Sequence, residues 1–160
     1  MSLPIVLLVE DDESDVLFLQ RAFKKAGLPH RLEVVMNGRA AVEYLSRDGP
    51  YADREKHPRP SHVLLDLKLP EKSGFEVLEW IRNNPELKDL HVSILTSSSE
   101  SADIQSAKLL RADCYLVKPM SFNALLEIVA SLDEWIRTDR VPAASLWADD
   151  APARSPRPRR

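Results

Sequence analysis

The sequence predicts an α/β domain built on a parallel sheet with helices on both faces. Short apolar runs alternate along the chain with longer stretches whose apolar residues recur at helical spacing, and this alternation occurs five times between Pro4 and Arg137. Strands separated by helices cannot pair as hairpins. They are therefore expected to run parallel, joined by right-handed crossovers.

The expected strands are short and almost continuously apolar, as strands buried on both faces are. They occupy residues 4–9, 31–36, 62–67, 91–96 and 114–119. The intervals between them predict helices over residues 14–27, 38–49, 74–85, 101–113 and 121–137. The helix over 121–137 has a broad apolar stripe, whereas the one over 101–113 is only weakly amphipathic.

Two segments lie outside this alternation. Residues 46–61 contain three prolines and predict a loop longer than most strand-to-helix connections. Residues 139–160 are rich in Pro, Ala and Arg and predict a tail with a disordered basic end. We expect a domain over residues 1–138, then this tail, with no output domain, because 23 residues after the last helix are too few for a DNA-binding module.

Composition argues against several classes of protein. Cys114 is the single cysteine, so an internal disulfide is excluded, which suits a cytoplasmic protein. The N-terminus resembles no signal peptide, and no stretch approaches the ~20 apolar residues of a membrane helix. The net charge is −3, and removing the four arginines of the last ten residues leaves −7 on residues 1–150. We therefore expect no membrane and no nucleic acid among the partners.

Polar residues follow the predicted strands at the edge where an open parallel sheet binds ligands. The first, third, fourth and fifth strands end in Glu10–Asp12, Asp66, Thr96–Ser97 and Lys118–Pro119. A carboxylate directly after a buried run is costly unless something pairs with it. Carboxylates gathered at one edge predict a Mg²⁺ site.

This set of groups suits phosphoryl transfer, because a metal ion, an ammonium group and a hydroxyl stabilise a phosphoryl group. We expect Asp66 to be the nucleophile that becomes phosphorylated, and Lys118 with Mg²⁺ to neutralise the added charge. Each residue also has a simpler explanation by itself. The acids after Val9 and the hydroxyls after Leu95 can cap helices, Asp66 can belong to a turn, and Lys118 can be a solvated strand end.

Because of these residues, the chain resembles a response-regulator receiver domain of a two-component system over about positions 3–137. The motifs are "LLVEDD", "LLDLKLP", "ILTSS" and "YLVKP". The resemblance implies a doubly wound, flavodoxin-like sheet of five strands in the order 2-1-3-4-5. It implies a phosphorelay in which a sensor histidine kinase transfers a phosphoryl group to the chain. Phosphotransfer and later autodephosphorylation would be self-catalysed, unlike the turnover of a conventional enzyme.

The resemblance also implies a role for individual residues. Asp66 would be the phosphoacceptor, with Thr96 and Lys118 as the catalytic partners, and Thr96 and Tyr115 as the switch. A cis bond would join Lys118 to Pro119. The magnesium ligands would be Glu10, Asp11, Asp66 and the backbone carbonyl of Lys68.

Signal output is expected through a changed surface along helix 101–113, strand 114–119 and helix 121–137. Apolar residues at the margin of the last helix, Leu126 and Trp135, and the "LW" pair at 146–147 predict a homodimer through this surface and the tail. Alternatively, Trp135 packs on its own sheet. The long loop and the phrases "VLLDLKLP" and "LTSS" resemble stand-alone receivers that are paired with bacterial phytochrome-type sensor kinases.

Two other functions remain open at this stage. Haloacid-dehalogenase-like phosphatases also use an aspartate nucleophile and magnesium. In those enzymes the nucleophile is the first acid of a D-x-D pair after the first strand. Here that strand is followed by "EDD", and "DLK" after the third strand lacks a second acid. The other alternative is a receiver-like protein-binding module that is never phosphorylated.

Overall fold

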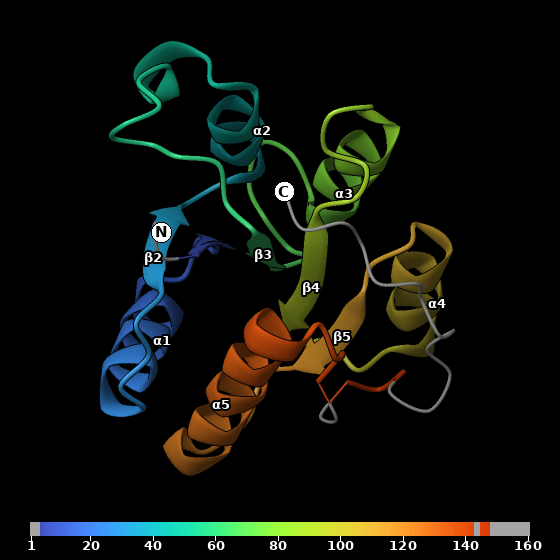
Figure 1. The fold of residues 1–160 in the computed structure, drawn as a ribbon. Helices are drawn as coiled ribbons and strands as arrows, with labels where there is room; N and C mark the ends of the chain where they lie inside the picture. Colours follow the sequence, from blue (N-terminus) through green and yellow to red (C-terminus); the bar gives the residue numbers. More distant parts are fainter. Residues whose placement is uncertain (1–3, 143–144, 148–160) are drawn as a thin grey trace.

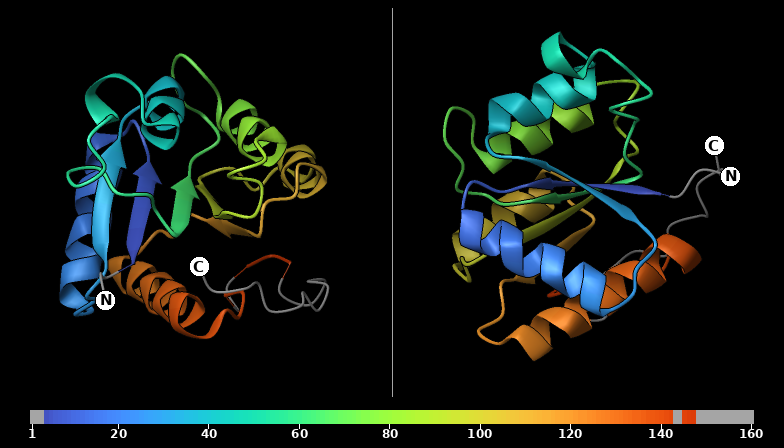
Figure 2. Two further views of the ribbon diagram at one scale, coloured as in Figure 1. Left: turned by 45° about the horizontal axis from the view of Figure 1, so that its top comes forward. Right: turned by 90° about the vertical axis from the view of Figure 1, so that its left-hand side faces the viewer.

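In the computed structural model, which describes residues 4–142 and 145–147, a five-stranded sheet lies between two layers of helices (Figures 1 and 2). All strand pairs are parallel and the order is β2-β1-β3-β4-β5, so the predicted fold class is confirmed. The strands are β1 (Ile5–Val9), β2 (Arg31–Val35), β3 (His62–Leu65), β4 (His91–Thr96) and β5 (Cys114–Val117). The helices are α1 (Glu13–Lys25), α2 (Gly38–Ser46), α3 (Gly74–Asn83), α4 (Ser101–Leu109) and α5 (Phe122–Thr138). Among the described residues no helix is both long and apolar enough to span a bilayer.

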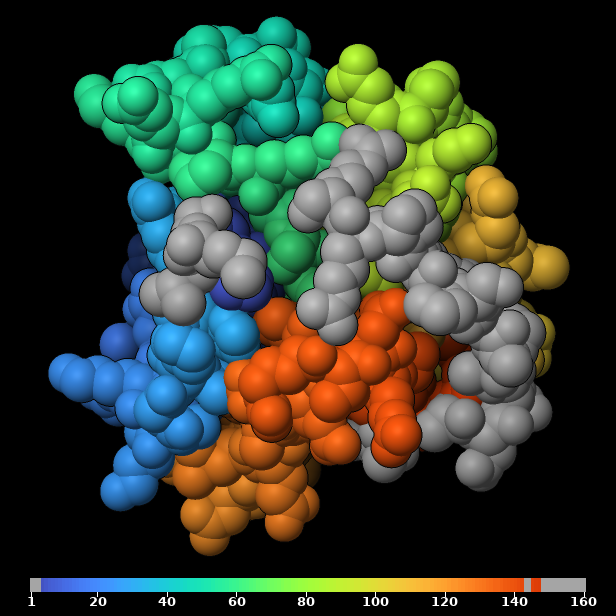
Figure 3. Space-filling view, viewed as in Figure 1, coloured from blue at the N-terminus to red at the C-terminus, as the bar shows by residue number. Residues whose placement is uncertain are grey.

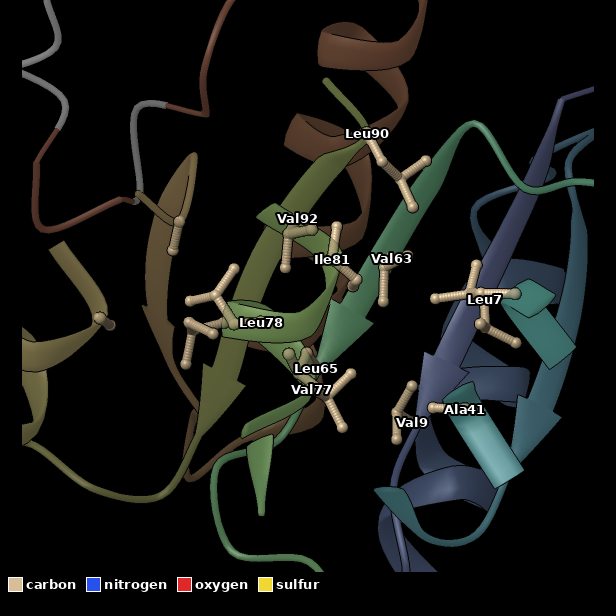
Figure 4. Packing of buried hydrophobic residues seen from close by; sticks show 14 of the residues in the cluster. Leu7, Val9, Ala41, Val63, Leu65, Val77, Leu78, Ile81, Leu90 and Val92 are labelled. Atoms are coloured by element: carbon tan, nitrogen blue, oxygen red, sulfur yellow. The ribbon is translucent and has the colours of Figure 1, made fainter. Parts of the chain in front are cut away.

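The central strands bury side chains on both faces of the sheet, which explains their continuous apolar runs. On one face, Leu7, Val63 and Val92 pack with residues of α2, α3 and α4 (Figure 4). On the opposite face, Leu8 and Leu64 pack with residues of α1 and α5. Successive residues of a strand point to opposite faces, so two separate cores result.

Two glycines allow helices to approach the loop that follows β3. A Cβ atom on Gly74, the first residue of α3, would lie 2.1 Å from the carbonyl oxygen of Asp66. A Cβ atom on Gly38, the first residue of α2, would lie 1.8 Å from the carbonyl oxygen of Lys72. Only a residue without a side chain fits at either position. The backbone after β3 is therefore held in place by steric contact on both sides.

The Pro-rich segment 46–61 is held against α2. It contains a short 3₁₀ helix, η1 (Gly49–Tyr51), and the ring centroids of Tyr51 and Tyr44 lie 5.2 Å apart. The hydroxyl of Tyr44 donates to the carbonyl of Pro58 at 2.9 Å. These contacts give the predicted loop a defined shape in spite of its length.

Trp135 packs within its own chain, which decides between the two explanations of this residue. Its side chain is buried, and its ring meets those of His62 and His91 edge-on at centroid distances of 4.9 and 5.1 Å. The two histidine rings are stacked on each other at 4.6 Å. The apolar stripe of α5 thus packs within its own chain, and Trp135 covers the amino ends of β3 and β4.

The described part of the tail lies beside β5. The amide of Leu146 donates to the carbonyl of Tyr115 at 3.0 Å, and the amide of Tyr115 donates to Ser145 Oγ at 3.2 Å. Trp147 is buried, with its ring centroid 5.8 Å from that of Tyr115. This segment therefore covers part of an edge strand. The predicted disordered basic end lies outside the described residues.

Candidate functional site

Asp66 immediately follows β3 and is only 7% exposed. Its amide donates to the carbonyl of Val9 at 3.1 Å, which ties it to the neighbouring strand β1. Its carboxylate accepts from the amide of Leu67 at 2.7 Å and from Lys118 Nζ at 2.8 Å. A buried carboxylate with these contacts is firmly oriented, and its charge is compensated by an ammonium group from a distant part of the chain.

Three carboxylates converge at this edge of the sheet. Glu10, Asp11 and Asp66 each present an oxygen within 4.8 Å of the others. They meet because β1 and β3 are adjacent, with Val9 level with Leu65. Asp12 points elsewhere and caps α1 by accepting from the amides of Ser14 and Asp15. The acid that caps α1 is therefore a different one from the two acids of this run that converge with Asp66.

Lys118 follows β5 and reaches across the edge of the sheet. Its ammonium contacts Glu10 at 2.7 Å and Asp15 and Asp66 at 2.8 Å. Burial by itself would lower the pKa of Lys118, but hydrogen bonds to these three carboxylates outweigh it and raise the pKa. The side chain is therefore a fixed positive charge.

The peptide bond that follows Lys118 is trans, so the expected cis bond is wrong for this structure. The preference between the two isomers of an X–Pro bond is only about 0.5–1 kcal/mol, so the residue types alone do not decide it.

Thr96 and Tyr115 are linked through Ser98. Thr96 is fully buried at the end of β4, and its Oγ1 accepts from the amide of Ser98 at 3.4 Å. Tyr115 is also fully buried, and its hydroxyl donates to the carbonyl of Ser98 at 2.8 Å. Ser98 Oγ donates to Asp103 of α4 at 2.6 Å. The ring of Tyr115, one of the two residues of the expected switch, therefore lies inside the domain.

The charges at this edge are unbalanced, with four carboxylates around one ammonium. Burial, followed by the charge of Asp66, raises the pKa of Glu10 to about 7, although hydrogen bonds from Lys118 and Asp12 lower it. A hard divalent cation that prefers oxygen ligands would relieve this excess, so the donor set fits magnesium. Lys68 lies in the loop after Asp66 with an exposed side chain, and its carbonyl as a ligand stays a prediction.

Asp15 also belongs to this site, although its position in the sequence predicts only a helix over residues 14–27. Its carboxylate lies 2.8 Å from Lys118 Nζ. Asp11 precedes α1 whereas Asp15 lies within it, so helical spacing does not relate the two acids, and no pattern in the sequence indicates this contact.

Comparisons with known proteins agree with this geometry. The family model described as "Response regulator receiver domain" matches residues 6–130. Response regulator Rcp1 of Synechocystis sp. is 38% identical over 141 residues, which are 88% of this chain and 94% of Rcp1. The phosphorylated cyanobacterial phytochrome response regulator RcpA superposes with a TM-score of 0.78 at 34% identity, over 86% of this chain and 96% of RcpA. The Mn²⁺-bound form of Rcp1 gives a TM-score of 0.76 at 37% identity, over 88% and 99% of the two chains.

Proposed function

Because the chain belongs to the response-regulator receiver family, we propose that it accepts a phosphoryl group from a sensor histidine kinase on the carboxylate of Asp66. One observation carries the proposal: Lys118 Nζ lies 2.8 Å from Asp66 within a cluster of carboxylates. This juxtaposition supports the proposal, because a buried carboxylate, a positively charged group and further carboxylate oxygens lie at one point.

In the proposed reaction, an oxygen of Asp66 attacks the phosphorus of a phosphohistidine. The new O–P bond forms as the P–N bond breaks, and its electron pair leaves with the imidazole nitrogen, which takes up a proton from water. Lys118 faces the transferred oxygens and offsets their charge. Thr96 accepts from Ser98 and keeps its hydrogen for a phosphoryl oxygen. Later attack by water on the acyl phosphate would return Asp66, so the cycle is self-limiting.

Magnesium, when bound, would supply a positive charge shared between Asp66 and the phosphoryl oxygens. The residues proposed to hold it are Glu10, Asp11, Asp66 and the Lys68 carbonyl. The relative Rcp1 has been crystallised in a form that binds Mn²⁺, an ion with similar oxygen preferences, which supports this part of the proposal.

The proposed signal passes through Ser98. If Thr96 turns toward a phosphoryl group, it leaves the amide of Ser98, whose carbonyl and hydroxyl hold Tyr115 and Asp103. The helix α4 is weakly held, since Ala107 is its one buried residue and its first turn has no side-chain cap. A small rearrangement at Ser98 would therefore alter the surface of α4, β5 and α5.

We further propose a phytochrome-type kinase as the phosphoryl donor. The names of RcpA and of a red-light response regulator from R. palustris support this, because both similar structures belong to light signalling. The loop 46–61 forms an exposed corner of the molecule and is available to a kinase (Figure 3). The rate of phosphoryl transfer to Asp66 from a phytochrome kinase should depend on the colour of illumination. A rate that is the same under all illumination would contradict this part of the proposal.

A homodimer through α4, β5, α5 and the tail is also part of the proposal. Fewer exposed apolar residues support it than the sequence predicted. Trp135 is buried within its own chain, but Leu109 at the end of α4 is 81% exposed and Leu146 beside β5 is 52% exposed. We expect sedimentation velocity to show a dimer that Leu109→Lys with Leu146→Lys weakens. A monomer at all concentrations and phosphorylation states would exclude it.

The central experiment is incubation with Mg²⁺ and a small phosphodonor. We expect one acid-stable, base-labile phosphoryl group per chain in the wild-type protein, and none in Asp66→Asn. Asp48→Asn is the matched control, since Asp48 is exposed and remote from the carboxylates.

The same experiment separates the alternatives. Continuous release of phosphate from added esters would favour a phosphatase. A wild-type protein that no donor labels would favour an unphosphorylated binding module.

A further inference from the structure

Lys118 has a carboxylate partner that is not part of the metal-binding cluster. Asp15, on the first turn of α1, lies 2.8 Å from Lys118 Nζ, while the clustered acids are Glu10, Asp11 and Asp66. The Asp15 side chain is 38% exposed and the Lys118 side chain 18%. The contact joins two segments 103 residues apart in sequence, so it does not result from chain proximity.

The chemistry of the proposed function distinguishes Asp15 from the other two partners of Lys118. An ammonium has three N–H donors, and here they meet Glu10, Asp15 and Asp66. During phosphorylation, Glu10 would turn its charge to the metal and Asp66 would become an acyl phosphate. Of the three side chains that contact Lys118, only Asp15 would remain an unmodified carboxylate facing Lys118 throughout.

Asp15 is also on a rigid support. Asp12 caps the helix at its start, and the buried residues Val16 and Leu19 fix α1 against the sheet. Lysine, by contrast, has a flexible four-carbon stem and a freely rotating head. A carboxylate on a fixed helix therefore restricts the position of a mobile cation.

We propose that Asp15 is a positioning residue that holds the Lys118 ammonium toward the phosphoryl group during transfer to Asp66. This inference rests on the proposed function and assigns to Asp15 neither metal binding nor bond making. Loss of this contact leaves the cation less well placed. The rate of phosphorylation should fall by about tenfold, since poor placement of a catalytic group is costly even without its removal.

The test compares Asp15→Asn, Asp15→Glu and Glu13→Gln with the wild-type protein. Phosphorylation by a small phosphodonor is followed over a range of Mg²⁺ concentrations, which separates the maximal rate from the Mg²⁺ concentration at half-maximal rate. Asp15→Asn should lower the maximal rate about tenfold, and Asp15→Glu should recover most of it. Glu13→Gln, an equal charge change at an exposed position of the same helix, should match the wild type.

The assignment would be overturned by an Asp15→Asn rate equal to that of Glu13→Gln, by a faster rate in Asp15→Asn, or by a loss that added Mg²⁺ fully restores. The last would show that the carboxylate acts on the metal. Failure of Asp15→Glu to recover any rate would indicate a merely structural role. A wild-type protein that takes up no phosphoryl group would instead overturn the proposed function itself.

Discussion

Two clusters of buried charge lie at opposite edges of the sheet, and they are built differently. At the amino ends of the strands, Arg82 of α3 pairs with Asp113 at 3.0 Å, with side-chain exposures of 5% and 3%. The guanidinium also donates to the carbonyls of Lys88, Leu90 and Arg111, and Asp113 accepts from the amide of Val92. Within this pair one guanidinium faces one carboxylate, and backbone carbonyls accept from its other nitrogens.

At the carboxyl ends, the ammonium of Lys118 contacts three carboxylates, and the carboxylate of Asp11 lies in the same cluster. A buried charge is thus not by itself a sign of function, because the Arg82 pair is as buried as Asp66. The balance of charge is the distinguishing feature. The Arg82 pair connects α3 with the segments before β4 and β5, whereas the cluster around Lys118 has an excess of carboxylate oxygens, the donors that a divalent cation prefers.

The largest expected effect is at the balanced pair. Arg82→Met should lower the free energy of unfolding by about 3–5 kcal/mol, because the buried Asp113 would lose the guanidinium that faces it. Urea unfolding measures this loss, and the folded variant should still accept a phosphoryl group. Arg39→Met removes an exposed arginine that pairs with Glu43, and should cost less than about 1 kcal/mol. If Arg82→Met and Arg39→Met lost equal amounts of unfolding free energy, the buried pair would be no more important for stability than the exposed one, which would contradict this prediction.

The second largest expected effect is stabilisation by Mg²⁺ at the carboxylate cluster around Lys118. Adding Mg²⁺ at about 100 times its dissociation constant should raise the free energy of unfolding by about 2.7 kcal/mol, since the ion binds the folded state. Thermal unfolding with Mg²⁺ and with a chelator measures the difference. The gain should shrink in Asp66→Asn and persist in Arg82→Met. An undiminished gain in Asp66→Asn would place the ion elsewhere.

The smallest effect is a dependence on pH without metal. The pKa of Glu10 is raised from 4.5 to about 7, so the folded state binds its proton more tightly than the unfolded state does. This contribution to stability is complete below about pH 4.5 and is lost as the pH rises through 7. Allowing for solvent at the open side of the site, the loss is about 1–2 kcal/mol. In urea titrations, Glu10→Gln should reduce the decline in the free energy of unfolding between pH 5 and 8. A decline as steep as in the wild-type protein would show that other groups cause it.

The sequence was sufficient for the fold and for the centre of the site, for a definite physical reason. Buried parallel strands are apolar almost throughout, so the polar residue that ends each run is conspicuous. Parallel pairing then brings Glu10, Asp66 and Lys118 to one edge. The sheet therefore converts a one-dimensional pattern into a three-dimensional cluster.

What the sequence did not reveal depends on the reach and packing of side chains. Asp15 belongs to the site because the long side chain of Lys118 reaches it. The spacing of residues in the sequence gives no sign of such a contact. Trp135 suggested an interface because it lies at the margin of the apolar stripe of the last helix. Its ring instead packs on the stacked rings of His62 and His91, which extend the core. Arg82 and Asp113 look like ordinary surface residues until α3 packs beside the segments that precede β4 and β5.

The closeness of Gly74 to the backbone of Asp66 has a consequence for mutational surveys of this protein. With 2.1 Å between a hypothetical Cβ and the Asp66 carbonyl oxygen, even a methyl group would displace the acid or the helix. A glycine with no reactive atom should thus tolerate replacement as poorly as the aspartate beside it. A search for essential positions restricted to ionisable side chains would overlook it.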